Sequence, residues 1–270
     1  MHSYGLKLWS INNNYIDSAI ELFNHDLFDY IELYAVPESF DTSSSWWKNL
    51  NIPYIMHGPH FAHGVNFSIK EAESKNIELV TEAMKYLDFL NGEKIIFHPG
   101  IKGDYKETAR QLNNLIKAKI IDSRVILENK PMKVIPGKSL LPTDDCVGYS
   151  PEQMKFIKEE TGLDIVLDIG HGTCAANALG LDYKEFLKEF IKLEPYMFHL
   201  SDGDIDGVMD KHLHIGSGTY DFEFIFSLFP EGSKISIETE KSYRNNLDDF
   251  IQDVYKLRNF EYYERLQKSS

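Results

Sequence analysis

The chain has 270 residues, of which 43% are hydrophobic, and it lacks an apolar stretch close to the roughly 20 residues that span a bilayer. With 28 basic against 42 acidic residues, the formal charge of -14 argues against broad, sequence-independent attraction to nucleic acid. Cys146 and Cys174 are too few for a disulfide framework, so we expect reduced thiols. We therefore expect a soluble, cytoplasmic protein with no membrane association and no obligate protein partner.

Apolar runs and amphipathic segments alternate along the chain as strand and helix. The expected strands begin near Tyr4, Tyr30, Pro53, Lys94, Val125, Asp164, Tyr196 and Lys234. The expected helices lie between them, over 16–24, 46–50, 69–90, 106–120, 151–161, 183–193, 221–228 and 246–258. Because no helical cluster or all-β section marks a second domain, we predict one α/β domain, a (β/α)8 TIM barrel over 1–258. The tail over 259–270 is expected to pack across the barrel bottom or to fray.

Several boundaries carry local signals. Ser150 precedes Pro151 as a helix N-cap, and Asp221 caps the next-to-last helix in the same way. The short second helix is the least regular, because a turn is expected over 43–45. The connection over 129–149 contains Pro131, Pro136, Gly137 and Pro142 and is too long for a plain βα loop. It forms either a lid or wall of the site or a surface excursion, and the sequence leaves both open.

Six of the apolar runs close in a side chain that binds divalent metals. One strand-end His or Asp is more often an ordinary hydrogen-bonding residue, but six in sequence order favour a metal site. In a barrel the C-terminal ends of all strands meet at one face, so we expect these side chains to converge. The six are His57, His98, Glu128, Asp168, His199 and Glu238.

Two short motifs add candidate ligands. A Gly-rich turn after Asp168 is expected to return His171 to the same rim. In an extended segment, alternation is expected to point Asp210, His212 and His214 to one side, where they clamp an ion; the other interpretation is a Gly-closed turn of solvated residues. Imidazole and carboxylate together suit Zn²⁺, with Mn²⁺ or Fe²⁺ as alternatives, whereas calcium or magnesium sites rarely contain so many histidines.

The chain resembles the endonuclease IV family of the xylose-isomerase-like barrels. The segments that carry the resemblance are His57-Gly-Pro, His98-Pro-Gly, Leu127-Glu128-Asn129, Asp168-Ile-Gly-His171 with Ala175-Ala176, His199-Leu-Ser-Asp202, Asp210-Lys-His212 with Gly216 and Gly218, and Glu238-Thr239. In that family a trinuclear zinc centre cleaves the DNA phosphodiester 5′ to an abasic site. The resemblance implies a first ion on His57, His98 and Glu128, a second bridged by Glu128 and held by Asp168, His199 and Glu238, and a third on His171, Asp210 and His212.

Such a centre suits phosphodiester hydrolysis. Two ions a few Å apart lower the pKa of a bridging water, while a third neutralises the phosphate oxygens and the leaving group. Glu128 or Glu238 is expected to orient the attacking water, and the sequence does not choose between them. We therefore predict a metal-dependent phosphodiester hydrolase with two or three zinc-type ions, acting on abasic DNA or on a small phosphorylated or sugar substrate.

The family's DNA-gripping loops are poorly matched. His60 stands where the family has a tyrosine that enters the duplex, and the loop over 35–45 contains no Arg or Lys but has Glu38 and Asp41. Trp46 and Trp47 are candidates for stacking on a base, although one Trp of such a pair is expected to be helix core.

Two alternatives remain. A sugar isomerase or epimerase would use one divalent ion on Glu128, Asp168, His199 and Glu238, with the two glutamates exchanging a proton at carbon. A non-catalytic metal-bearing binding protein is the third interpretation.

Overall fold

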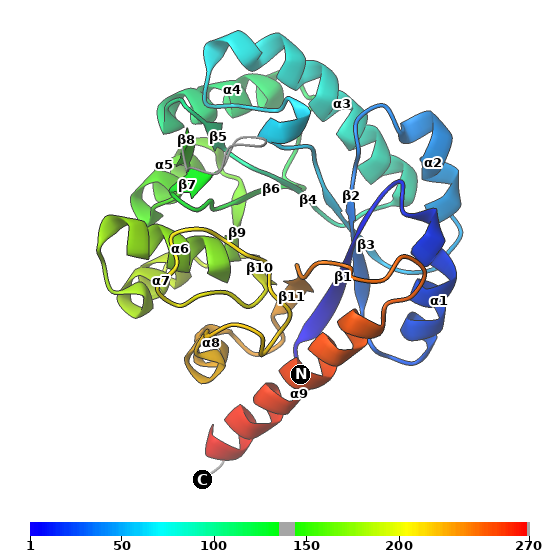
Figure 1. Ribbon diagram of the computed structural model, residues 1–270. Coiled ribbons are helices and arrows are strands. Elements are labelled where there is room, and N and C mark those ends of the chain that lie inside the picture. Colours follow the sequence, from blue (N-terminus) through cyan, green and yellow to red (C-terminus); the bar gives the residue numbers. More distant parts are fainter. Residues whose placement is uncertain (135–143, 269–270) are drawn as a thin grey trace.

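The computed structural model describes residues 1–134 and 144–268, and eight parallel strands in it close into a barrel (Figure 1). The order around the barrel follows the chain, and the first strand pairs with both the second and the last. The predicted (β/α)8 barrel is therefore confirmed. The barrel strands are β1 (Ser3–Trp9), β2 (Tyr30–Tyr34), β3 (Tyr54–His57), β4 (Ile95–Phe97), β6 (Val125–Glu128), β9 (Asp164–Asp168), β10 (Met197–Leu200) and β11 (Lys234–Ile237).

Helices surround the barrel in Figure 1 and cover the outward faces of its strands. Strands buried on both faces need apolar side chains at successive positions, which explains the continuous apolar runs in the sequence. The helices are α1 (Ile16–Asn24), α2 (Phe40–Trp47), α3 (Glu73–Leu90), α4 (Tyr105–Lys117), α5 (Pro151–Thr161), α6 (Ile169–Leu179), α7 (Tyr183–Ile191), α8 (Phe222–Leu228) and α9 (Asp248–Lys268). Among the described residues, no helix is both long and apolar enough to cross a membrane.

The barrel interior is built in layers that alternate along each strand. One buried cluster inside the barrel contains Tyr30, Ile55, Ile96, Ile126, Val166 and Met197. Gly5 and Ser236 complete this layer, because the ring of Tyr30 fills the space beside Gly5 and its hydroxyl lies 3.1 Å from Ser236 Oγ. Side chains two residues apart in a strand point to the same side. The next layer toward the C-terminal rim is therefore Lys7, Glu32, His57, His98, Glu128, Asp168, His199 and Glu238.

The second helix differs from its prediction. It spans α2, which begins six residues earlier than expected and includes Ser43–Ser45 as helix rather than as a turn. The Ser43 hydroxyl donates to the carbonyl of Ser39 at 2.8 Å, one helical turn back, so the serine run satisfies itself within the helix. Trp47 is fully buried and its indole N–H donates to the Ser10 carbonyl at 2.8 Å, while Trp46 is 38% exposed. The expectation that one Trp of the pair is core is confirmed.

A helix replaces the turn expected after Asp168. Helix α6 begins directly at the end of β9, and the Asp168 side chain accepts a hydrogen bond from the His171 N–H at 2.7 Å as its N-cap. Gly172 is needed inside this helix because a Cβ there would lie 2.6 Å from Leu187 Cδ2 on α7. The prediction of a Gly-rich turn was wrong because these glycines serve close packing.

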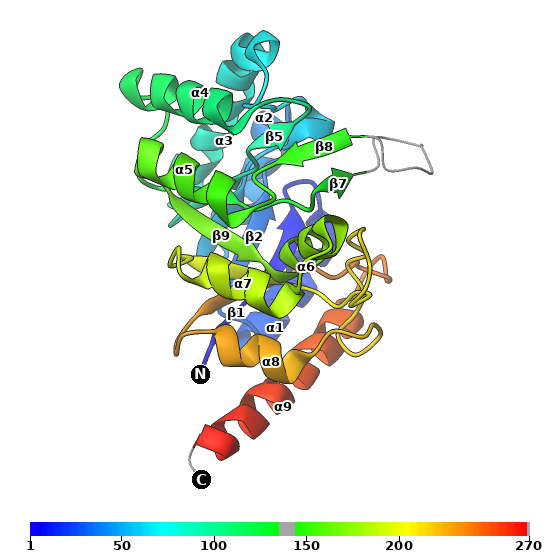
Figure 2. The same cartoon turned by 90° about the vertical axis from the view of Figure 1, so that its left-hand side faces the viewer.

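The C-terminal tail is also helical, since α9 continues to Lys268 instead of ending at residue 258. Its extension packs at the bottom of the barrel beside the N-terminus (Figures 1 and 2). Phe260 stacks on Phe222 with ring centroids 5.0 Å apart, and the Glu261 carboxylate accepts from the His2 N–H and the Tyr4 hydroxyl. Of the two alternatives for the tail, packing applies to this described part.

The long connection after β6 contributes a wall. Its described ends form β7 (Lys133–Val134) and β8 (Asp144–Val147), which pair with β5 (Gly100–Ile101) in a small antiparallel sheet outside the barrel (Figure 2). Lys130, Pro131, Lys133 and Val134 line the central pocket, so this part is a wall of the site and not a surface excursion. Pro136, Gly137 and Pro142 lie outside the described residues. Cys146 and Cys174 are buried and form no disulfide.

Candidate metal centre

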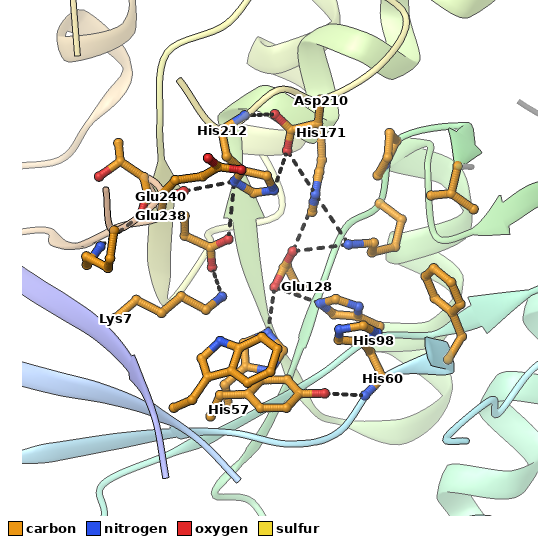
Figure 3. Close-up of a pocket in the computed structure, with 18 of the residues that line it drawn as sticks. Lys7, His57, His60, His98, Glu128, His171, Asp210, His212, Glu238 and Glu240 are labelled. Carbon is orange, nitrogen blue, oxygen red and sulfur yellow. Dashed lines mark hydrogen bonds and ion pairs between the residues drawn. The ribbon is translucent and has the colours of Figure 1, made fainter. Parts of the chain in front are cut away.

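A cavity of about 740 Å³ lies at the C-terminal rim of the barrel, above the layer that holds the candidate ligands (Figure 3). All nine side chains predicted as metal ligands lie at this rim. Their roles as ligands remain predictions. The residues that could hold ions form three groups, and Glu128 links two of them.

The first group is His57, His98 and Glu128, all buried. His57 Nε2 lies 3.3 Å and His98 Nε2 lies 3.0 Å from Glu128 Oε2. His57 Nδ1 lies 2.8 Å from the Gly58 carbonyl, which fixes the proton on Nδ1 and leaves the lone pair on Nε2. This is the arrangement by which proteins prepare a histidine for a metal ion.

The second group is His171, Asp210 and His212. His171 Nε2 and His212 Nε2 lie 3.3 and 3.1 Å from Asp210 Oδ2. Each imidazole again has Nδ1 at 2.9 Å from a backbone carbonyl, that of Asn129 for His171 and that of Glu238 for His212. Nε2 of both rings therefore faces the position where an ion would lie.

The third group contains His199, Glu238 and a residue that the sequence analysis missed, Glu32. His199 Nδ1 lies 2.7 Å from Glu238 Oε1, and its Nε2 lies 2.9 Å from Glu32 Oε2. Lys7, also missed, contacts Glu238 and lies 3.3 Å from Glu32 Oε1. Both residues lie inside the apolar runs of β1 and β2, not at their ends. The signal that finds them is alternation, since Lys7 and Glu32 stand two positions after Gly5 and Tyr30.

The grouping differs from the one that the resemblance implied for the second ion. His199 does lie 3.2 Å from Glu128 Oε2, but Asp168 belongs with Glu128 and His171, and its Oδ2 lies 3.6 Å from His171 Nδ1. The reason is the N-cap contact that holds Asp168 toward the first turn of α6.

His214 is not part of the centre. Its Nδ1 lies 2.8 Å from Asp253 Oδ2 on α9, and its Nε2 lies 3.2 Å from the Ser242 hydroxyl. The expected alternation of Asp210, His212 and His214 fails because His212 has φ +46°, which turns the chain out of the extended conformation.

Unsatisfied buried atoms indicate that the side chains fit divalent ions. Buried polar atoms almost always have hydrogen bonds, because burying them alone is costly. Among the described residues, several buried atoms of this centre have none despite their short contacts, and an ion would satisfy several of them at once. These atoms are both oxygens of Glu32, both ring nitrogens of His199, His98 Nδ1 and Asp210 Oδ2. Imidazole and carboxylate donors in this mixture fit Zn²⁺, Mn²⁺ or Fe²⁺.

Electrostatics keep the glutamates charged. Burial alone would raise the pKa of Glu128, but His98 and Lys130 outweigh burial and lower it well below its usual range. The pKa of Glu238 is lowered in the same way by His199 and Lys7 against the effect of burial. Asp168 is the exception, since burial, aided by Asp210, raises its pKa to about 6. Carboxylates ready to bind cations at neutral pH follow from this balance.

His171 carries a proton in the absence of an ion. Burial lowers its pKa, but Asp168 and the other acidic partners outweigh burial and raise it to about 10. An ion on Nε2 has to displace this proton, so ion binding to the second group releases protons.

Aromatic rings form the wall of the cavity above β1, β2 and β3. Trp9 is 41% exposed and packs on Tyr34 with ring centroids 5.1 Å apart. His60 stacks on His98 at 5.3 Å with the ring planes 15° apart. The acidic loop with Glu38 and Asp41 does not line the cavity.

Comparisons with known proteins agree with this geometry. An uncharacterized protein of Methanocaldococcus jannaschii is 24% identical over 178 residues, 65% of this chain and 65% of the relative. An apurinic-apyrimidinic endonuclease of Caenorhabditis elegans is 24% identical over 199 residues, 67% of this chain but only 49% of the relative. The chain thus spans between about half and two thirds of the length of these relatives.

Solved structures share the fold. A D-tagatose 3-epimerase-like protein superposes with a TM-score of 0.70 at 19% identity, covering 99% of this chain and 100% of that one. Endonuclease IV from Thermus thermophilus also gives 0.70, at 18% identity and with 96% and 98% covered. The sequence profile of the family described as "Xylose isomerase-like TIM barrel" matches residues 18–259. The chain therefore belongs to the xylose isomerase-like TIM barrel family.

Proposed function

We propose that the protein is a metal-dependent hydrolase that cleaves a phosphodiester at the rim of its barrel. The observation that carries this proposal is the convergence of His57, His98, His171, Asp210 and His212 beside the deeper acidic residues. An enzyme that uses one ion to isomerise a sugar has no chemical need for these five. More than one ion is the requirement of phosphodiester hydrolysis, since both the attacking water and the leaving oxygen need stabilisation.

The chain's own residues would divide the work. The first group, through His57, His98 and Glu128, and the second group, through His171, Asp210 and His212, would hold zinc-type ions. Bound ions supply an acidified water and neutralise negative charge on the phosphate. Glu128 lies between the two groups and would orient the attacking water, while the cavity walls restrict access of bulk water to the reacting phosphate.

The substrate class follows from the cavity and the charge. An abasic DNA strand is the leading extended substrate, supported by the similarity to the Caenorhabditis elegans apurinic-apyrimidinic endonuclease. A small phosphorylated sugar is close behind, because the chain carries a formal charge of -14 and the loop after β2 is acidic. Trp9 and Tyr34 offer a surface for the flat face of a base or a sugar ring.

A sugar isomerase or epimerase is the second candidate. Glu128, His199 and Glu238 form a compact buried set without the outer histidines, and the fold is shared with a D-tagatose 3-epimerase-like protein. In such a reaction the two glutamates would exchange a proton at the sugar carbon next to a carbonyl.

One experiment separates the candidates. Protein loaded with Zn²⁺ or Mn²⁺ is assayed on an abasic duplex at low salt, on bis(p-nitrophenyl) phosphate, and on aldoses and ketoses in D2O. We expect phosphodiester cleavage that a chelator and Glu128→Gln abolish. A matched control is Glu93→Gln, because Glu93 pairs with Lys234 and Tyr196 away from the cavity. Incorporation of deuterium into a sugar, with no cleavage of any phosphodiester, would identify the isomerase instead.

A further inference from the structure

Lys7 is a cation built into the candidate centre. Its side chain is 17% exposed, contacts Glu238, and lies 3.3 Å from the fully buried Glu32 (Figure 3). It comes from the middle of β1, where strand alternation directs the side chain into the barrel. The ammonium therefore lies between two carboxylates of the third group.

A divalent ion in the third group would need those same carboxylates. An ion held by Glu32, His199 and Glu238 would lie next to the Lys7 ammonium, and the two cations would repel each other at a site with little water. His199 is also arranged differently from the other candidate ligands. Both of its ring nitrogens face carboxylates, whereas His57, His171 and His212 each have Nδ1 on a backbone carbonyl.

The formal charges favour two ions over three. Five carboxylates of the centre face two ammonium groups that contact them, Lys7 and Lys130, which leaves three negative charges if the imidazoles are neutral. Two divalent ions turn this into one positive charge, which a bound hydroxide or phosphodiester balances. Three ions leave three positive charges in a largely buried site, which is unfavourable. The carboxylates are Glu32, Glu128, Asp168, Asp210 and Glu238.

We propose that Lys7 takes the place of a metal ion in the third group, so that the centre binds two divalent ions, one in each of the other groups. Glu32 then serves as the partner of Lys7 and His199 and is a positioning residue. The inference rests on the proposed function only in that the first two groups bind ions.

The test is the number of ions per chain. Wild-type protein and variants are saturated with Zn²⁺ or Mn²⁺, freed of loosely bound metal by gel filtration, and measured by elemental analysis. We expect two ions for the wild type and for Lys7→Arg, which keeps the charge. Lys7→Met is expected to bind three, because it removes the charge and keeps the volume. Glu32→Gln is expected to retain two ions, since Glu32 holds none.

The control is Lys130→Met, because Lys130 is the other lysine of the centre. Its Nζ lies 3.6 Å from Glu128 Oε1 and 3.3 Å from His171 Nε2, and it comes from the loop after β6. We expect two ions in this variant. An equal gain with Lys130→Met would mean that total charge and not the place of Lys7 sets the ion count, which overturns the inference.

Two further results also overturn it. Three ions in the wild type would mean that an ion displaces the Lys7 ammonium, and this outcome does not depend on any variant folding. A loss of one ion in Glu32→Gln would mean that Glu32 is a ligand. Failure of the proposed function is distinguishable, since it appears as absent phosphodiester cleavage with the ion counts unchanged.

Discussion

The carboxylate of Asp168 accepts a hydrogen bond from the backbone N–H of His171 at 2.7 Å, so one side chain both caps helix α6 and belongs to the candidate metal centre. The cap also fixes where the His171 ring stands, because His171 lies in the first turn of that helix. Folding of α6 and assembly of the centre are therefore coupled through this contact.

Substitutions of Asp168 separate the two roles. Asp168→Asn keeps a good N-cap but removes the charge, whereas Asp168→Ala removes both. Without metal, we expect Asp168→Ala to lower the free energy of unfolding by about 1 kcal/mol and Asp168→Asn to lower it by much less. Both variants are expected to bind metal more weakly. Urea unfolding with chelator and metal titration measure the two effects, and equal loss of stability in both variants would contradict the cap.

The stability of the metal-free protein should depend on His60 at acidic pH. Burial, aided by the positive charge of Lys130, lowers the pKa of His60 from 6.5 to about 2, so the folded protein keeps this ring neutral. The unfolded chain takes up the proton below pH 6.5, so the contribution of His60 is lost as the pH falls from that value toward 2. We expect the wild type to lose up to about 1.4 kcal/mol per pH unit more than His60→Phe. Parallel unfolding free energies of the two proteins between about pH 7 and 5 would refute this assignment.

His212 should matter for turnover more than for folding. Its side chain is 36% exposed, and its φ of +46° is a conformation that asparagine adopts readily. We expect His212→Asn to change the free energy of unfolding by less than about 0.5 kcal/mol while activity falls strongly. His199→Asn is the comparison, because His199 is fully buried and its loss should cost stability as well. Melting curves and turnover are measured together, and a proportional loss of both in His212→Asn would show a structural role.

Trp9 should bind the substrate without taking part in the chemistry. Its ring lines the cavity and is 41% exposed, so a base or sugar ring can lie against it. We expect Trp9→Ala to raise KM about tenfold, equivalent to the roughly 1–3 kcal/mol of a stacked base, with little change in kcat. Trp46→Ala is the control, since Trp46 is similarly exposed at 38% but does not line the cavity. A fall in kcat with unchanged KM would exclude a stacking role.

Much of the centre can be predicted from the sequence because a parallel barrel brings its strand ends together. Runs such as Ile95-Ile96-Phe97 ending in His98 identify both the strand and the rim. Lys7 and Glu32 were missed because their strands continue for two residues beyond them, to Trp9 and Tyr34.

Other differences arose where short-range signals compete with packing. The glycines after Asp168 indicate a turn in isolation, but Gly172 serves contact with Leu187 across two helices. His214 shares the alternation of its neighbours, yet Asp253, distant in the sequence, binds it elsewhere. Neither partner is visible in the local pattern.

The order of apolar and metal-binding residues therefore dictates the barrel and the rim, because strand periodicity and burial act within each segment. Which carboxylate faces which imidazole, and that an ammonium lies among them, depends on distances between strands far apart in the chain. Those distances are set when the closed barrel brings β1 between β2 and β11, so that Lys7 reaches Glu32 and Glu238.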